Sequence, residues 1–213
     1  MTIRILLADE ADLMLLGVQT ILQDHLEFQV VHTTRSAEGL LEAVRHCQPE
    51  IVLFNERLDQ LIDVLALVER LKHASPRSRM MVLGSLADGL LVRDLFACGV
   101  LAYLYAGDDL QDCLIPAIST VLNNRPYLSP TANAEYLVAM QSPLRDWQLD
   151  SESRAVLRLL ARGMHVSDIA AQMDVPLRRI YWVRHKLRKR FGAETNEHLI
   201  SRAVSEGFTY LED

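Results

Sequence analysis

The stretch IVLFNERLDQ, residues 51–60, begins with four apolar residues and turns polar at Asn55. A short and fully apolar run of this kind is typical of a strand that is buried on both faces of a parallel sheet. In open parallel sheets, ligands and chemistry lie at the carboxyl ends of the strands. The run therefore brings Asn55 to a place where a functional side chain is expected, and an uncharged amide there requires an explanation.

Similar apolar runs alternate with helix-length segments through the first half of the chain. Strands are expected at residues 3–8, 28–32, 50–54, 79–84 and 101–105. Apolar residues spaced three and four apart predict helices at residues 12–24, 36–47, 61–74, 88–98 and 109–123. Five such β–α units predict an α/β fold, a doubly wound sheet of five parallel strands. The polar or small residues at its strand ends are Asp9, Glu10, Asn55, Gly84, Ser85, Tyr105 and Ala106.

Charge is distributed unevenly along the chain. The net charge of −6 combines 10 Lys/Arg and 18 Asp/Glu in residues 1–143 with 12 and 10 in residues 144–213. Seven basic residues and no acidic residue lie in residues 178–190. An acidic part joined to a part with a concentrated basic segment predicts two domains with different partners. The three scattered cysteines, the dispersed histidines and the absence of a signal pattern predict a cytoplasmic protein without a zinc site.

The second half reads as a linker followed by four helices. Three prolines in residues 124–146 predict a linker that contains a short helix at about 131–140. Residues 147–213 then form an all-α domain. Its first helix is expected to be capped by Asp150 or Ser151 and to end at Gly163, and its last to run over 195–207. The apolar positions of this domain are expected at Val156, Leu159, Leu160, Ile180, Val183, Leu187 and Phe191.

A short helix, a tight turn and a basic amphipathic helix form a helix-turn-helix arrangement. Ser167 is expected to cap the short helix, and Pro176 to begin the basic one. In such proteins the second helix enters the major groove of DNA. The residues expected to meet DNA are Arg178, Arg179, Tyr181, Trp182, His185, Lys186, Arg188 and Lys189.

Two roles within this set stay open. Arg and Lys suit guanine edges, so base contacts are expected from Arg178, Arg179 or Lys186, with Arg188 and Lys189 on phosphates. The run RHKLRKR could instead be the solvated face of a helix. Trp182 could be a packing or dimer residue rather than a base reader.

The motifs LLADEADLMLLGVQTIL, PEIVLFNERL, MMVLGS and CGVLAYLYAGDDL resemble, in order and spacing, the receiver domain of bacterial two-component response regulators. This resemblance covers residues 1–123. VLRLLARG, DIAAQM, and Ile180 followed twelve residues later by Gly192 resemble the LuxR-type DNA-binding domain over residues 147–208. Together they resemble the NarL-type response regulators. In the second domain the chain departs from the family at Ser153, Pro176 and residues 181–183, so the DNA sequence it prefers is not predicted.

The resemblance implies a role for each strand-end residue of the first half. In the family an acidic pair holds Mg²⁺, an aspartate accepts phosphate, and a hydroxyl residue and a lysine complete the site. Here the pair is Asp9 and Glu10, but the phosphoacceptor position is Asn55, the hydroxyl position Gly84 and the lysine position Ala106. An amide does not attack phosphorus. The resemblance therefore implies a pseudo-receiver, with Ser85 the nearest available hydroxyl.

Several alternatives remain at this site. Asp9 and Glu10 could bind a divalent cation weakly or could be solvated acids, and no other cofactor is predicted. Asn55 could cap its loop, or the pocket could hold another ligand. The leading hypothesis is a non-enzymatic transcriptional regulator that binds double-stranded DNA without being phosphorylated. The rivals are a small-ligand sensor and a protein-docking adaptor.

A homodimer is expected as well, because one recognition helix reads few base pairs. The candidate pairing surfaces are the helix at 109–123 and the last helix around Leu199, Ile200 and Ala203. The alternative is that both apolar stripes belong to the core.

Overall fold

The computed structural model describes residues 2–58, 64–85, 87–141, 149, 151–205 and 208–209, the side chain of Ser151 excepted. The chain forms two compact units, residues 1–140 and 141–213. The expected cap Asp150 and the expected last helical residue Gly207 lie outside the described residues, as does the beginning of the helix predicted at 61. No helix in the described ranges has the length and apolar character needed to cross a membrane.

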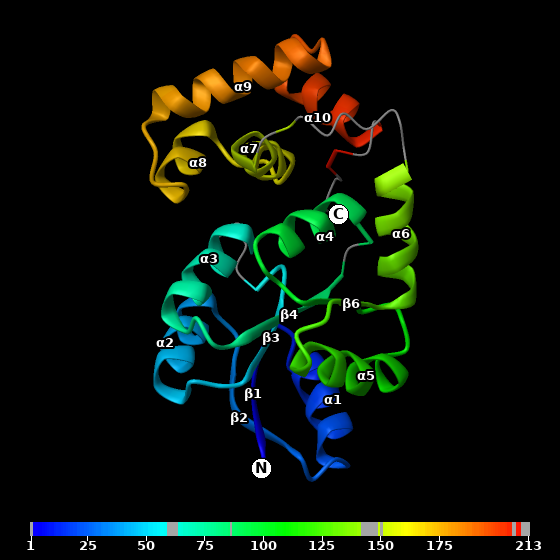
Figure 1. The fold of residues 1–213 in the computed structure, drawn as a ribbon. Helices are drawn as coiled ribbons and strands as arrows, with labels where there is room; N and C mark the ends of the chain where they lie inside the picture. The colour runs from blue at the N-terminus through cyan, green and yellow to red at the C-terminus, as the bar shows by residue number, and fades with distance from the viewer. Residues whose placement is uncertain are drawn as a thin grey trace. The chain divides into compact units, whose positions relative to one another are not determined.

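The first unit is built on one parallel sheet with the strand order β2-β1-β3-β4-β5-β6 (Figure 1). The strands are β1 (Ile3–Ala8), β2 (Phe28–Thr34), β3 (Ile51–Asn55), β4 (Arg79–Gly84), β5 (Ala102–Tyr105) and β6 (Tyr127–Leu128). The doubly wound α/β class predicted from the sequence is confirmed. Within the described residues the sheet has six strands rather than five, because the two residues of β6 pair with β5.

Helices cover both faces of this sheet. They are α1 (Asp12–Gln23), α2 (Ala37–Cys47), α3 (Val64–Ala74), α4 (Gly89–Ala97), α5 (Leu110–Leu122) and α6 (Pro130–Gln141). One apolar core lies between the sheet and α1 and α5, and the other between the sheet and α2, α3 and α4. The central strands are apolar on both faces because both faces are covered, and their polar ends gather at one edge.

The helix α6 packs on the first unit. Its N-terminal end is held by the loop after β5: Thr131 N–H donates to Asp108 Oδ2 at 3.0 Å, and Tyr105 N–H donates to Ser129 Oγ at 2.9 Å. Burial raises the pKa of Asp108, but hydrogen bonds from Ser129 and Thr131 outweigh it and lower the pKa below its ordinary value. Farther along, a side chain at Gly89 of α4 would overlap the backbone of α6 at Glu135. Part of the segment read as a linker is thus folded structure.

The described part of the second unit contains four helices around one apolar core. They are α7 (Ser151–Ala161), α8 (Val166–Gln172), α9 (Leu177–Phe191) and α10 (Asn196–Ser205). All seven apolar positions expected in this core are buried: Val156, Leu159, Leu160, Ile180, Val183, Leu187 and Phe191. Gly163, with φ +78°, ends α7 as predicted, because a left-handed backbone favours glycine.

One helix start differs from prediction. His165 precedes α8 as its N-cap, so Ser167 lies inside the helix and its hydroxyl donates to Asp168 instead of capping. The basic helix α9 begins next to Pro176, as expected; Pro176 is its N-cap and adopts an extended ψ of 137°. Both proposed pairing stripes are largely core: Cys113, Leu114, Ala117 and Ile118 of α5 are buried, as are Leu199 and Ala203 of α10.

Candidate functional sites at the sheet edge and on helix α9

The ends of β1 and β3 are joined by a hydrogen bond between an amide and a carboxylate. Asn55 Nδ2 donates to Asp9 Oδ2 at 2.9 Å. Asn55 Oδ1 accepts the backbone N–H of Arg57 at 2.7 Å, which fixes the orientation of the amide because a backbone N–H can only donate. The other oxygen of Asp9 accepts the N–H of Ala11 at 2.8 Å. Both side chains are therefore satisfied within the protein.

The acidic pair does not behave as two solvated acids. Asp9 is only 4% exposed and is bound by Asn55, so the expectation of solvation is wrong for this residue. Glu10 is exposed. Within the described ranges, no group of three or more His, Cys, Asp or Glu side chains is arranged to hold a metal ion.

The hydroxyl position at the end of β4 is filled by a neighbour. A side chain added at Gly84 would overlap the ring of Tyr103, whose Cε1 lies 2.7 Å from the ideal Cβ position. Tyr103 lies on β5, beside β4, and is fully buried. Glycine at this position makes room for the tyrosine ring. The lysine position, Ala106, is half-buried and its N–H donates to Gly84 O at 2.7 Å.

A buried acid, Glu56, links the β3 and β4 loops. Its Oε1 accepts both the backbone N–H and the hydroxyl of Ser85, at 2.7 and 2.8 Å. Glu56 is 3% exposed, and among the described residues its Oε2 has no hydrogen-bond partner. Burial raises the pKa of the Glu56 carboxyl, although the bonds from Ser85 oppose the rise. Glu56 was not among the predicted site residues, because an acid that follows a strand commonly faces solvent.

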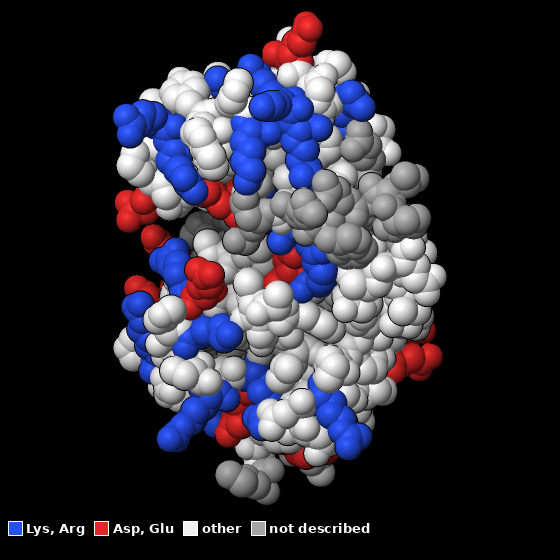
Figure 2. All heavy atoms as spheres, turned by 45° about the horizontal axis from the view of Figure 1, so that its top comes forward, with Lys and Arg blue, Asp and Glu red and all other residues white. Residues whose placement is uncertain are grey.

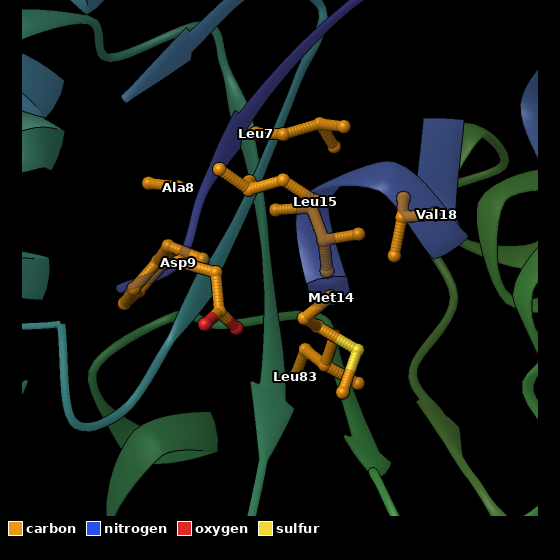
Figure 3. Close-up of a pocket in the computed structure, with 9 residues that line it drawn as sticks. Leu7, Ala8, Asp9, Met14, Leu15, Val18 and Leu83 are labelled. Carbon is orange, nitrogen blue, oxygen red and sulfur yellow. The ribbon is translucent and has the colours of Figure 1, made fainter. Parts of the chain in front are cut away.

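A small cavity lies beside Asp9 (Figure 3). Its volume is about 10 Å³, room for roughly one water molecule. The lining is almost entirely apolar and comes from β1, α1, β3 and β4: Leu7, Ala8, Asp9, Met14, Leu15, Val18, Leu53, Phe54 and Leu83. Neither Asn55 nor Ser85 lines it, so this cavity is not the ligand pocket expected around those two residues.

The outer face of α9 carries an array of cations and aromatic rings. Seven of the eight residues predicted on this face are exposed: Arg178, Arg179, Tyr181, Trp182, His185, Lys186 and Lys189. Figure 2 shows Lys and Arg gathered over the helical unit. The buried residues of α9 lie three and four positions apart and face inward, so the charged residues are left on the opposite side.

Arg179 is held by an acid of α7. Its Nε and Nη2 donate to the two oxygens of Glu152 at 2.8 and 2.7 Å. The same guanidinium lies 4.7 Å from the centre of the Trp182 ring, and Lys186 Nζ lies 5.6 Å from it. A forked pair of this kind fixes the guanidinium plane. Arg179 is thus engaged within the unit; it is one of the three residues, with Arg178 and Lys186, from which base contacts are expected.

Arg188 differs from its neighbours on α9. It is half-buried, and its Nη2 donates to Asn196 Oδ1 at 2.7 Å, at the start of α10. This bond joins α9 to α10. Lys189, the other residue expected on phosphates, is exposed.

Comparison with known proteins places this two-unit arrangement among regulators. No family model matches the chain. The transcriptional regulatory protein MctR of Rhizobium johnstonii is 25% identical over 205 residues, which cover 96% of this chain and 94% of MctR. The response regulator GacA of Pseudomonas aeruginosa is 23% identical over 209 residues, 96% of this chain and 97% of GacA.

Solved structures share the fold over the same length. RcsB from Salmonella enterica serovar Typhimurium, bound to promoter rprA, aligns with a TM-score of 0.77 at 17% identity, covering 95% of this chain and 98% of that one. A structure of two RcsB dimers on two parallel DNAs aligns with a TM-score of 0.64 at 16% identity, covering 96% and 99%. This chain is thus similar from end to end to bacterial transcriptional and response regulators, and it shares the two-unit fold of RcsB.

Proposed function

We propose that this chain is a DNA-binding transcriptional regulator that acts without phosphorylation of an aspartate. The observation that carries this proposal is the amide of Asn55 at the phosphoacceptor position, hydrogen-bonded at both ends to Asp9 and to the N–H of Arg57. An acyl phosphate requires a carboxylate oxygen as nucleophile, and an amide carries no charge and has its lone pair delocalised.

The surroundings of Asn55 also fit a site without phosphate chemistry. Mg²⁺ requires several oxygen ligands in octahedral geometry, whereas Asn55 turns its NH₂ group toward Asp9 and its oxygen toward the N–H of Arg57. The donor set therefore does not fit the cation that the family uses. Gly84 and Ala106 offer neither a hydroxyl nor a positive charge to a phosphoryl group.

The DNA-binding part of the proposal rests on α8 and α9. A short helix precedes a basic helix whose exposed face carries Arg178, His185, Lys186 and Lys189. Basic side chains on one face of such a helix neutralise phosphates and contact base edges. The similar RcsB chains are described as bound to DNA.

We propose a homodimer as the form that binds. One recognition helix reads too few base pairs for a useful specificity ratio, and paired units on adjacent half-sites solve this. RcsB is described as a dimer on DNA. The inner stripes of α5 and α10 are core, so these stripes are not available for pairing. The outer face of α1 exposes Leu13 and Leu16, at 82% and 60%, and is the surface we assign to the dimer.

One set of measurements on the full chain tests this function. The protein is incubated with acetyl phosphate and Mg²⁺, its intact mass is recorded, and its affinity for duplex DNA is measured over a series of salt concentrations. We expect no phosphoryl adduct, an affinity that falls steeply with salt, and no effect of the phosphodonor on either affinity or dimer mass. An adduct within residues 50–60 would overturn the phosphate-independent mechanism. A chain that binds no DNA even at low salt would instead be a docking adaptor.

The dimer surface has its own test by light scattering. Leu16→Glu places a charge on the outer face of α1, away from the core, and should shift the full chain to the monomer mass. The matched variant Gln111→Glu, on the exposed face of α5, should still show the mass of a dimer by light scattering. A dimer that survives Leu16→Glu would exclude this face.

A further inference from the structure

We infer that Trp182 determines part of the DNA sequence preference of this protein by contacting the C5 methyl group of a thymine in the major groove. The inference rests on the proposed function, namely that α9 enters the groove. It assigns a base-reading role to a residue whose type suits packing equally well.

Trp182 lies on the outward side of α9. The helix turns about 100° per residue, so Trp182 lies roughly 140–180° around it from Ile180, Leu187 and Phe191, which are buried. The indole is 52% exposed. Trp182 therefore does not belong to the core of its own unit, and this exposure argues against a packing role for it there.

The indole is also held in place. The Arg179 guanidinium, fixed by two hydrogen bonds to Glu152, lies 4.7 Å from the ring centre. Lys186 adds a second cation, 5.6 Å from the same centre. Cations over a ring face are attracted by its negative quadrupole. A side chain that is oriented before binding loses less entropy on contact than a free one, which is what a base-reading residue requires.

The chemistry of the ring selects the base feature. An indole offers one donor, Nε1–H, and a large apolar area. The thymine methyl is the apolar feature of the major-groove edges, and the other features are hydrogen-bonding groups that Arg and Lys read better. Arg178 is exposed one turn before Trp182, next to it on the same face, and is suited to a neighbouring guanine. Trp182 is therefore matched to thymine.

The experiment removes single methyl groups from the DNA. Duplexes that bind the full chain are selected from a random pool, and each thymine of the preferred site is replaced in turn by deoxyuridine, which lacks only the methyl. Burying one methyl contributes about 0.8 kcal/mol, so wild-type affinity should fall about fourfold at the contacted thymine of each half-site. For Trp182→Ala the same replacement should change affinity less than twofold, whereas Trp182→Phe should keep part of the effect. The control Leu177→Ala, at an exposed apolar residue of α9 outside the set expected to contact DNA, should keep the wild-type pattern.

The outcomes separate this inference from the proposed function. A wild-type protein that binds no duplex would overturn the proposed function itself. Binding that is insensitive to every deoxyuridine, or a methyl effect that persists in Trp182→Ala, would overturn the role of Trp182 and leave DNA binding intact. Light scattering of Trp182→Ala completes the test: loss of the dimer mass would make Trp182 a pairing residue and would likewise overturn the inference.

Discussion

Replacing Asn55 by aspartate directly tests the role of the hydrogen bond between Asn55 and Asp9 at the carboxyl edge of the sheet. In Asn55→Asp the new side chain keeps an acceptor for the N–H of Arg57 but loses the donor to Asp9, 2.9 Å away. Two unit charges about 3 Å apart repel by ~5 kcal/mol at an effective dielectric of about 20. This is an upper limit, because two such carboxylates can share a proton. We expect the first unit to lose about 2–4 kcal/mol of stability at neutral pH.

Hydrogen exchange of β1 and β3 peptides measures this loss in the full chain, since it reports the opening of these strands separately from the second unit. Millimolar Mg²⁺ should restore most of the protection in the variant and none in the wild type, because the variant has three carboxylates with Asp9 and Glu10. The double variant Asp9→Asn, Asn55→Asp exchanges amide and carboxylate and should recover stability without Mg²⁺. Wild-type protection of Asn55→Asp in EDTA would refute the reasoning.

Three further predictions concern single residues. Glu56→Gln should flatten the pH dependence of first-unit stability. Because the folded pKa of Glu56 is raised, its contribution to stability is complete below about pH 4.5 and is lost as pH rises through the raised pKa. The urea midpoint of the wild type should therefore fall over this rise in pH while that of the variant stays nearly constant. Gly84→Ala should cost about 1–3 kcal/mol, because its Cβ overlaps the buried tyrosine of β5, and an unchanged urea midpoint would contradict this. Lys189→Ala should lower the salt dependence of DNA binding by about one unit with unchanged thermal stability, whereas Arg188→Ala, which breaks the bond to α10, should lower the melting temperature of the helical unit.

The fold was predictable because its signals are local. The runs at 3–8 and 79–84 match β1 and β4 in full, since strands covered on both faces are almost entirely apolar. The inward positions of α9 followed from helical spacing alone. The strand β6 escaped prediction, because two residues in a proline-containing stretch leave no periodic pattern. Ser167 failed as a cap because α8 begins one residue before it, and helix ends are the least certain part of such predictions.

The site was less predictable because its contacts join distant residues. Asn55 and Asp9 lie 46 positions apart, and Arg179 and Glu152 lie 27 apart. Residue type suggested Arg179 as one of three candidate guanine readers and Arg188 as a phosphate contact, but it gave no sign of the hydrogen bonds that each makes within the helical unit. Glu56 carries no sequence signal of burial, since only the packing of its loop removes it from water.

The anchoring of α6 has a mechanical consequence. Its first turn is bonded to the β5 loop through Asp108, and its middle rests on α4 at Gly89 and through the Phe96–Tyr136 ring contact. A helix of this length is a rod of about 18 Å. Any rearrangement of the β5 loop, which carries Ala106, would therefore reach the far end of α6 as a tilt or a rotation. The chain leaves the first unit at the end of α6, so the orientation of α6 sets the direction in which the chain leaves that unit.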